Sequence, residues 1–314
     1  MSKKLCFVVC VGLALLLAAC GPTADPGEEA SGEGFTVAAT TYPVYLFAQT
    51  VTQGADNVTV TLMINQSVGC LHDYTLSVQD MKVLEGADLV LLNGAGLEAS
   101  MADALTASGV AQLDCAALGN VSPLESCHDH DHDHDHAHAV TSEDDPHIWM
   151  DPNRAAQMLQ GMAAGLSEQN PENAALYAAN AQAAVETLQT AAADWQARLA
   201  PLVCREMITF HDGFAYFAEA FDLTILRAIE EESGSEASAQ LLTEVARQVT
   251  EHQLPAIFTE VNGATASAQL ISQETGVPVF PLNLIMSGET EGADLDTYLS
   301  AMEQNVVTLL EAYS

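Results

Sequence analysis

The sequence predicts an α/β protein of two lobes, each with a parallel sheet flanked by helices, bridged by one long rigid helix. Short apolar runs alternate with helix-like segments from residue 35 onward, one long helical stretch interrupts them, and the alternation then resumes. Strands that alternate with helices are typical of parallel sheets. Hydrophobic residues make up 49% of the 314 residues, so the chain can bury a core large enough for this fold.

Residues 1–19 predict an export signal and are left out of the fold. Lys3 and Lys4 precede an apolar run at 5–17, and the small residues of LAAC follow. The run is too short to span a hydrocarbon layer of ~30 Å at ~1.5 Å per residue, so a permanent membrane helix is the weaker interpretation. Because LAAC resembles the lipobox of bacterial lipoproteins, we expect Cys20 to be acylated after cleavage. An ordinary cleaved signal with a chance cysteine is the alternative.

Residues 20–34 predict a flexible tether between the lipid and the fold, because they are rich in Pro, Gly, Glu and Ser without an apolar period. Removal of residues 1–19 changes the formal charge from −35 to −37, since it removes two lysines and no acidic residue. Nucleic acid and anionic lipid surfaces are therefore poor partners, whereas small cations are concentrated near such a surface.

The first lobe is expected over residues 35–170. Its strands are expected at 36–41, 58–64, 88–93 and 112–116, with helices around 44–51, 77–84 and 98–107. A long connection at 118–146 interrupts the lobe and contains a His-rich loop at 127–138. Structureless connections of this length are usually functional or disordered.

A linking helix is expected at residues 171–201, and the second lobe at 202–314. Helix-forming residues fill 172–199 between Pro171 and Pro201, which act as start and stop signals. About 28 residues at ~1.5 Å each give ~42 Å, enough to reach from one lobe to the other. Strands follow at 206–210, 224–228, 256–260 and 277–281, with a helix at 239–252. A ligand site between the lobes would be built from loops at the carboxyl ends of strands.

Six of the ten histidines lie in the low-complexity run CHDHDHDHDHAH. They are His128, His130, His132, His134, His136 and His138. Imidazole and carboxylate groups that alternate on a flexible chain suit borderline cations such as Zn²⁺. The run therefore predicts an accessory metal loop, with a solvated polar tract as the alternative.

Three further histidines, His72, His147 and His211, fall at or near the ends of expected strands in both lobes. A shared cation explains three such positions better than three unrelated side chains do. Three neutral imidazoles favour Zn²⁺ over Mn²⁺, which prefers oxygen ligands, and affinity should fall as the pH drops through the ordinary histidine pKa of ~6.5. His252 ends an expected helix, where its ring can interact with carbonyls, and is left out of the site.

Four segments carry a family resemblance. They are GCLHDY at 69–74, DLV at 88–90 with NGAGLE at 93–98, DPHIWMDP at 145–152, and FHDGFAY at 210–216. From about residue 35 to the C-terminus the chain resembles the zinc-binding solute receptors, many of them lipoproteins, of metal ABC importers. The resemblance implies a metal-receptor type of periplasmic-binding fold with the metal held by three histidines in the cleft between the lobes. It also implies a monomer, not an enzyme, that delivers Zn²⁺ to a permease and its ATPase at the extracytoplasmic face of the cell membrane.

The fourth ligand departs from the family pattern. Many relatives have an Asp after the last strand, where this sequence has Asn283, and an amide is a poor zinc ligand. Glu289 is the expected substitute, because other zinc receptors use a Glu in this loop. A water molecule or Glu260 remains an alternative.

Two other functions share this set of donors. A metallohydrolase would also use three protein ligands and an open position, with Asp212 or Glu260 as base, but no H-E-x-x-H motif is present. A manganese receptor or surface adhesin would share the fold, although the histidines argue against manganese. The cysteines beyond Cys20 form no C-x-x-C pair, so a thiolate site is not expected. They are Cys70, Cys115, Cys127 and Cys204, and an exported chain allows three disulfide pairings among them.

Overall fold

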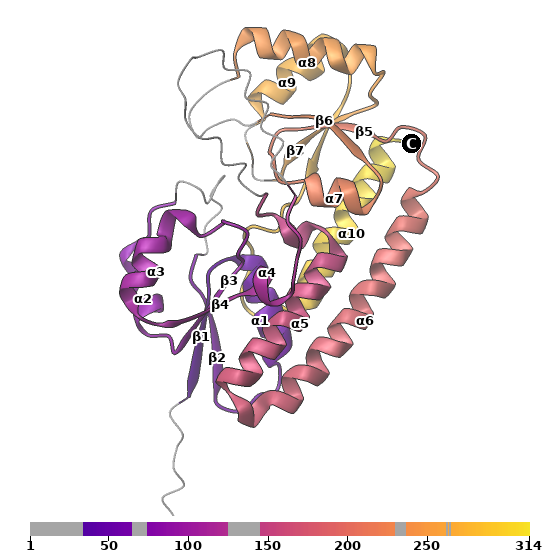
Figure 1. Ribbon diagram of the computed structural model, residues 1–314. Helices are drawn as coiled ribbons and strands as arrows, with labels where there is room; N and C mark the ends of the chain where they lie inside the picture. Colours follow the sequence, from indigo (N-terminus) through magenta and orange to yellow (C-terminus); the bar gives the residue numbers. More distant parts are fainter. Residues whose placement is uncertain (1–33, 65–73, 125–144, 230–236, 262, 264) are drawn as a thin grey trace, which may run out of the picture. The chain divides into compact units, whose positions relative to one another are not determined.

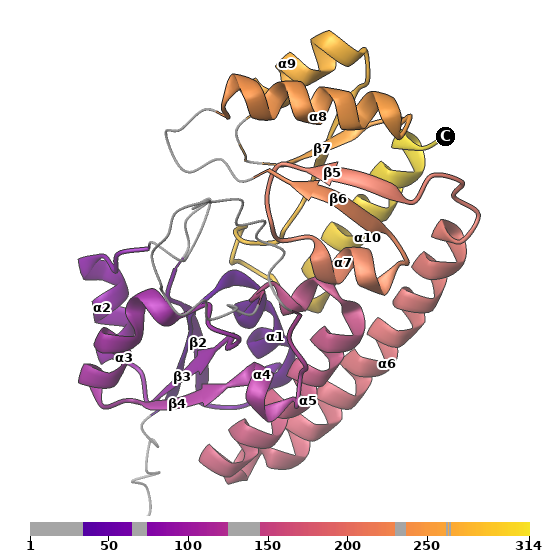
Figure 2. The same ribbon diagram turned by 45° about the horizontal axis from the view of Figure 1, so that its top comes forward.

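The computed structural model describes residues 34–64, 74–124, 145–229, 237–261, 263 and 265–314. Residues 34–314 form one compact unit that contains two four-stranded sheets. The early strands build one sheet and the late strands build the other, each with helices beside it (Figures 1 and 2). The predicted α/β class with two parallel sheets is confirmed.

The first sheet has the strand order β2-β1-β3-β4, and every pairing in it is parallel. Its strands are β1 (Phe35–Ala39), β2 (Val58–Leu62), β3 (Leu89–Leu92) and β4 (Ala111–Asp114). The central strands β1 and β3 are apolar runs with mostly buried side chains, as expected for strands covered on both faces. Because all four strands run the same way, Thr40, Asn93 and Asp114 come together at one edge of the sheet.

Helices flank this sheet, and local sequence signals fix their ends. They are α1 (Tyr42–Thr52), α2 (Val78–Glu85), η1 (Ala99–Met101), α3 (Ala102–Ser108), α4 (Cys115–Leu118), η2 (Ile148–Met150) and α5 (Pro152–Gln169). Ser77 and Asp80 form a reciprocal capping box that begins α2. Helix α5 packs closely on α4, since a Cβ atom on Gly161 would lie 2.4 Å from the main-chain nitrogen of Gly119. This close approach requires glycine.

The second sheet has the order β6-β5-β7-β8 and is also parallel. Its strands are β5 (Glu206–Thr209), β6 (Thr224–Ala228), β7 (Ile257–Glu260) and β8 (Val279–Leu282), and the helices of this part are α7 (Ala215–Ala220), α8 (Ala239–Glu251), α9 (Ala266–Thr275) and α10 (Leu295–Ala312). Alternate residues of its central strands enter different cores. Ile208 and Ile257 join a cluster with residues of α8 and α9, whereas Met207 and Phe258 join the larger core that continues into the first lobe.

The predicted linking helix is confirmed as α6 (Ala174–Leu199), which follows the short η3 (Pro171–Asn173). Its 26 residues span about 39 Å. Near its start, Asn180 donates a hydrogen bond to the carbonyl of Val51 at the end of α1. Near its end, the Trp195 ring packs edge-on against Phe221, which follows α7. The helix therefore contacts both lobes.

Helix α10 also joins the two lobes. At its start, the main-chain nitrogen of Leu295 donates to Oγ1 of Thr50 in α1 at 2.9 Å. At its end, Oη of Tyr313 donates to the carbonyl of Glu206 in β5 at 2.8 Å. The C-terminal helix is therefore bound to the first lobe at one end and to the second sheet at the other.

Some boundaries differ from the sequence-based expectation for local reasons. The strand expected at 112–116 stops at Asp114, because its carboxylate accepts a hydrogen bond from the nitrogen of Ala117 and begins α4. The single helix expected at 98–107 is a 3₁₀ turn followed by α3. Helix α5 was not predicted, since its two glycines lower its apparent helix propensity.

The structure also bears on the cysteines and on membrane insertion. Cys115 and Cys204 are free thiols, whereas Cys70 and Cys127 lie outside the described residues. Among the helices that the structure describes, none combines the length and the apolar character needed to cross a bilayer. The expected signal, tether and lipid site at Cys20 lie outside the described residues.

Candidate metal centre

His147 lies in a buried segment just before η2, and its side chain is 6% exposed. Its Nδ1 atom lies 2.8 Å from Oδ1 of Asp145, and the same oxygen accepts a hydrogen bond from the main-chain nitrogen of His147. We assign the ring proton to Nδ1 from this pairing, which leaves the lone pair on Nε2. Metal-binding histidines usually donate one ring N–H to a carboxylate, which orients the ring and leaves the other nitrogen free to bind the metal.

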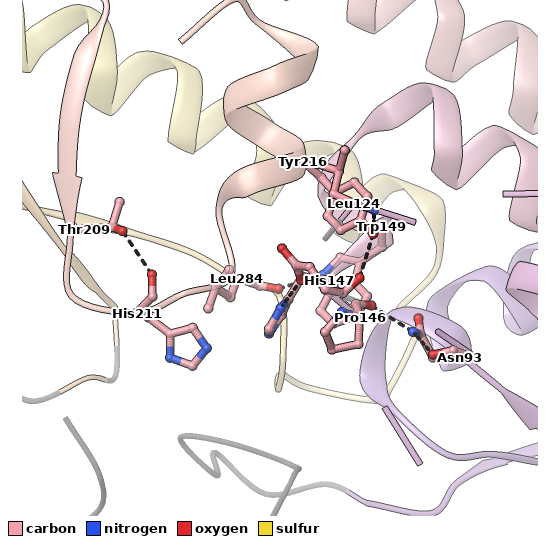
Figure 3. Close-up of polar contacts among 11 residues, drawn as sticks. Asn93, Leu124, Pro146, His147, Trp149, Thr209, His211, Tyr216 and Leu284 are labelled. Atoms are coloured by element: carbon pink, nitrogen blue, oxygen red, sulfur yellow. Dashed lines mark hydrogen bonds and ion pairs between the residues drawn. The ribbon is translucent and has the colours of Figure 1, made fainter. Parts of the chain in front are cut away.

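The main chain around Asp145 is held by side chains from both lobes. Tyr216 of α7 donates from Oη to the carbonyl of Asp145 at 2.6 Å. Asn93, which follows β3, donates from Nδ2 to the carbonyl of Pro146 at 2.9 Å. Figure 3 shows these contacts converging on the segment that carries His147. The main chain at Asp145 and Pro146 is therefore held in place, and this positions the Asp145 carboxylate against the His147 ring.

Asn93 is held in turn by the buried carboxyl group of Glu98. This group accepts hydrogen bonds from the main-chain nitrogens of Asn93 and Gly94 at 2.7 and 3.1 Å, and from Oγ1 of Thr40 at 2.7 Å. Burial raises the pKa of Glu98 above its usual range, although the three hydrogen bonds oppose that shift. The loop after β3 is thus fixed to the end of β1, which positions Asn93 for its bond to Pro146.

His211 comes from the other sheet, two residues beyond the end of β5, and meets His147. The two ring centroids are 5.5 Å apart and the ring planes are nearly perpendicular, at 89° (Figure 3). Oγ1 of Thr209 donates to the carbonyl of His211 at 3.0 Å. Gly213 provides the space for both rings, because a Cβ atom there would lie 2.9 Å from Cδ2 of His211 and 3.1 Å from Cδ2 of His147.

Glu260 ends β7 beside His211. Strand pairing sets Thr209 opposite Phe258. His211 and Glu260, each two residues further along, therefore emerge at the same edge of the sheet. Oε2 of Glu260 lies 3.6 Å from Nδ1 of His211, and its side chain is 13% exposed. Burial raises the pKa of Glu260 to about 7, with a smaller opposing effect from His147.

Buried hydrogen bonds tie the His147 segment to the second lobe as well. Nε1 of Trp149 donates to the carbonyl of Leu284 in the loop after β8 at 2.8 Å. Oη of Tyr298 in α10 donates to the carbonyl of Trp149 at 2.7 Å. These bonds bring the loop that was expected to supply a fourth ligand close to η2.

Within that loop, Asn283 has a structural role. Its main chain exchanges two hydrogen bonds with the side chain of Asn305 in α10, and its Oδ1 accepts a bond from the nitrogen of Ile285, which has a φ of +61°. Its amide oxygen therefore supports a left-handed turn. Glu289 is exposed, its carbonyl accepts a hydrogen bond from Oη of Tyr42, and it lines a surface pocket of about 310 Å³.

The remaining predicted donors are placed as follows. His72 and the six histidines of the His-rich loop lie outside the described residues. Among the residues that the structure does describe, no three or more His, Cys, Asp or Glu side chains form a group that could hold a metal ion. His252 ends α8, but its Nδ1 atom contacts the Glu206 carboxylate at 2.9 Å rather than the helix carbonyls expected from the sequence.

The supporting roles of Asp145, Asn93, Glu98 and Tyr216 were not predicted from the sequence. For Asp145 a local signal exists, since a carboxylate two residues before a histidine can reach its ring. Asn93 and Tyr216 act through contacts with residues far apart in the chain, and Glu98 combines two local hydrogen bonds with a distant one to Thr40.

The comparison with protein families bears on what this arrangement does. A family described as "Zinc-uptake complex component A periplasmic" matches residues 37–312. The chain belongs to this family. Its members are substrate-binding receptors of ABC-type metal uptake and not enzymes, so the donor set described here belongs to a metal-binding receptor. The metallohydrolase alternative is thereby excluded.

Individual proteins similar to this chain are named for different metals. The chain is 25% identical to the manganese-binding lipoprotein MntA of Halalkalibacterium halodurans over 317 residues, which cover 99% of each protein. It is 27% identical to the zinc-binding lipoprotein AdcA of Streptococcus pneumoniae over 98% of this chain and 60% of that protein. A crystal structure of ZnuA is similar with a TM-score of 0.75 at 25% identity, and covers 90% of this chain and 100% of that one.

For this member of the family, replacement of Asp145 by Asn is expected to weaken metal binding by about 10- to 100-fold, because carboxylates that orient ligating imidazoles typically contribute this much. Competition with a chelating dye measures the effect. Asp294→Asn is the matched control, since Asn caps helices as well as Asp does and the Asp294 side chain caps α10 instead of contacting a histidine. Equal affinities for Asp145→Asn and the natural protein would show that the pair does not prepare His147.

Proposed function

We propose that this chain is an extracytoplasmic receptor that captures Zn²⁺ between its two lobes and delivers it to the permease of an ABC importer, powered by a separate ATPase subunit. The approach of His147 and His211, from different parts of the fold, to a ring separation of 5.5 Å carries this proposal. His72 supplies the third imidazole in this proposal, on the basis of the sequence. The receptor binds and releases its cargo, a metal ion, without catalysing a reaction.

The donor chemistry supports zinc over manganese. Imidazole nitrogen suits Zn²⁺, whereas Mn²⁺ prefers carboxylate and water oxygens, and zinc lies above manganese in the general order of affinities. AdcA is named for zinc and MntA for manganese, so similarity alone does not choose between them. The choice rests on the two histidines that meet and on the assignment of His72 as a third.

We assign the fourth position to Glu260 in preference to Glu289. The Glu260 carboxylate is 3.6 Å from the His211 ring in a largely buried position, so a small movement brings both groups to one ion. The contact of Glu289 with Tyr42 is made by its main-chain carbonyl, and the residue is exposed. A carboxylate beside three neutral imidazoles leaves the zinc site with a net charge of +1.

The rest of the proposal follows the sequence. Residues 1–19 are removed, Cys20 carries the lipid, and residues 20–34 tether a monomer to the outer face of the cell membrane. The histidines at 128–138 collect zinc near the main site. The divisions at 35–170, 171–201 and 202–314 are the two lobes and the linking helix, and no nucleic acid takes part.

Calorimetric titration of the soluble chain from Gly21 onward with Zn²⁺ and with Mn²⁺ tests this function. One tight zinc site is expected, with affinity for manganese lower by at least about two orders of magnitude, because the site is rich in nitrogen. Deletion of residues 128–138 is expected to remove the weaker zinc sites and to leave the tight one unchanged. Loss of the tight site on deletion, or equal affinity for the two metals, would contradict the proposal.

A further inference from the structure

Leu124 and Asp145, which flank residues 125–144 in the sequence, are joined by a hydrogen bond, and we call this pair the neck. The main-chain nitrogen of Asp145 donates to the carbonyl of Leu124 at 2.8 Å. In a β-turn the nitrogen of the fourth residue donates to the carbonyl of the first, and Asp145 and Leu124 form the same kind of hydrogen bond. The two residues of the neck are therefore held side by side, immediately before His147.

A single oxygen atom from the other lobe binds both sides of the neck. Oη of Tyr216 accepts a hydrogen bond from the nitrogen of Leu124 at 2.9 Å and donates its proton to the carbonyl of Asp145 at 2.6 Å (Figure 3). The Tyr216 side chain is fully buried. The hydroxyl therefore uses its one proton and one lone pair on the neck.

The Tyr216 ring is itself fixed in place. The guanidinium of Arg154 lies over it, with Cζ 4.8 Å from the ring centroid. Nη1 of Arg154 bonds to Asp151 at the start of α5 and to Glu219 of α7, at 2.8 and 2.6 Å. Because the cation is bound to both helices, it is held over one face of the ring and limits the positions that the ring can take.

The contacts then continue to the metal centre. The Asp145 carbonyl is bound by Tyr216, and the carboxylate of the same residue is bound to Nδ1 of His147. Tyr216 also lies on the segment that begins with His211. One short segment of the second lobe thus carries both the candidate ligand His211 and Tyr216. Tyr216 holds Asp145, the hydrogen-bond partner of the other candidate ligand, His147.

We propose that Tyr216 is a positioning residue that couples the neck of segment 125–144 to the metal site. Its hydroxyl holds the neck closed and so keeps the Asp145 carboxylate on His147. The metal-affinity part of this inference rests on the proposed function, whereas the orientation of His147 in the metal-free protein does not.

Tyr216→Phe removes only the hydroxyl and tests the inference in the soluble chain. Zinc affinity is expected to fall about tenfold, the lower end of the range for groups that support a ligand. In the metal-free protein, NMR is expected to show faster solvent exchange of the His147 Nδ1 proton. Tyr177→Phe is the matched control, because it removes another fully buried tyrosine hydroxyl, bonded to Asn170, outside the neck.

A shortened chain separates coupling through the neck from a general loss of rigidity. In it, an Asn-Gly pair replaces residues 125–144, so that a covalent two-residue turn closes the same hydrogen bond between Leu124 and Asp145. Tyr216→Phe is then expected to change zinc affinity less than about twofold, a non-additive result.

Equal losses in the long and shortened chains, or the same behaviour in Tyr216→Phe and Tyr177→Phe, would overturn the inference. If the natural chain shows no tight zinc site, the proposed function fails, and the exchange of the His147 proton in metal-free protein decides the positioning role by itself.

Discussion

Zinc binding is expected to weaken by more than about 100-fold when His147 is replaced by Ala, because a ligating group contributes more than the 10- to 100-fold typical of the groups that support one. The ring is nearly buried, its Nδ1 atom is held by Asp145, and its centroid lies 5.5 Å from that of His211. The substitution therefore removes a donor that the fold has already oriented. Competition with a chelator of known affinity measures the loss.

His252→Ala is the matched control for this experiment. It removes the same side chain from a surface position, where the ring contacts Glu206 instead of the candidate site. Its zinc affinity should equal that of the natural protein. A His147→Ala variant that remains folded and binds zinc within about threefold of the control would show that the site has been assigned to the wrong residues.

Replacement of Glu260 by Gln is expected to stabilise the metal-free protein at pH 8 by as much as about 3 kcal/mol. Burial raises the pKa of this carboxyl from 4.5 to about 7, so the folded protein binds the proton more tightly than the unfolded chain does. The stability that Glu260 contributes is complete below about pH 4.5 and is lost as the pH rises through about 7. Gln stays neutral at every pH, so the stabilisation should vanish near pH 4.5.

Denaturant unfolding in the presence of a chelator, at a series of pH values, measures this effect. Glu289→Gln is the control, because it makes the same substitution at an exposed position. Zinc titration of the same two variants separates the two candidates for the fourth ligand, since affinity should fall for Glu260→Gln and remain for Glu289→Gln. A Glu260→Gln variant no more stable than the natural protein at pH 8 would contradict the burial argument.

The central strands of both sheets could be predicted from the sequence because they are covered on both faces and read as short apolar runs. The run at 206–210 agrees with the central strand β5 to within one residue, and the run at 224–228 agrees with the edge strand β6, whose residues are partly buried or exposed. Helix α6 was recognisable from its length and its flanking prolines. Helix α5 was not, because its glycines serve a close contact with α4 that only the folded structure shows.

The candidate site could be predicted only in part. His211 follows β5 as expected, whereas His147 precedes η2 and does not stand at the end of a described strand. The family resemblance assigned both to one site, and the structure brings them together. The proximity of Glu260 depends on the pairing of Thr209 with Phe258, which no local pattern determines. The role of Tyr216 depends on contacts with residues about 70 to 90 positions earlier in the chain.

Helices α6 and α10 restrict how the two lobes can move when the cargo is exchanged. Each contacts both lobes, and they are joined to one another by the ion pair between Arg198 and Glu303. A hinge in one connection would have to break the contacts of the other. These contacts oppose a hinge between the sheets and favour exchange of the cargo through movement of the loops at the strand ends.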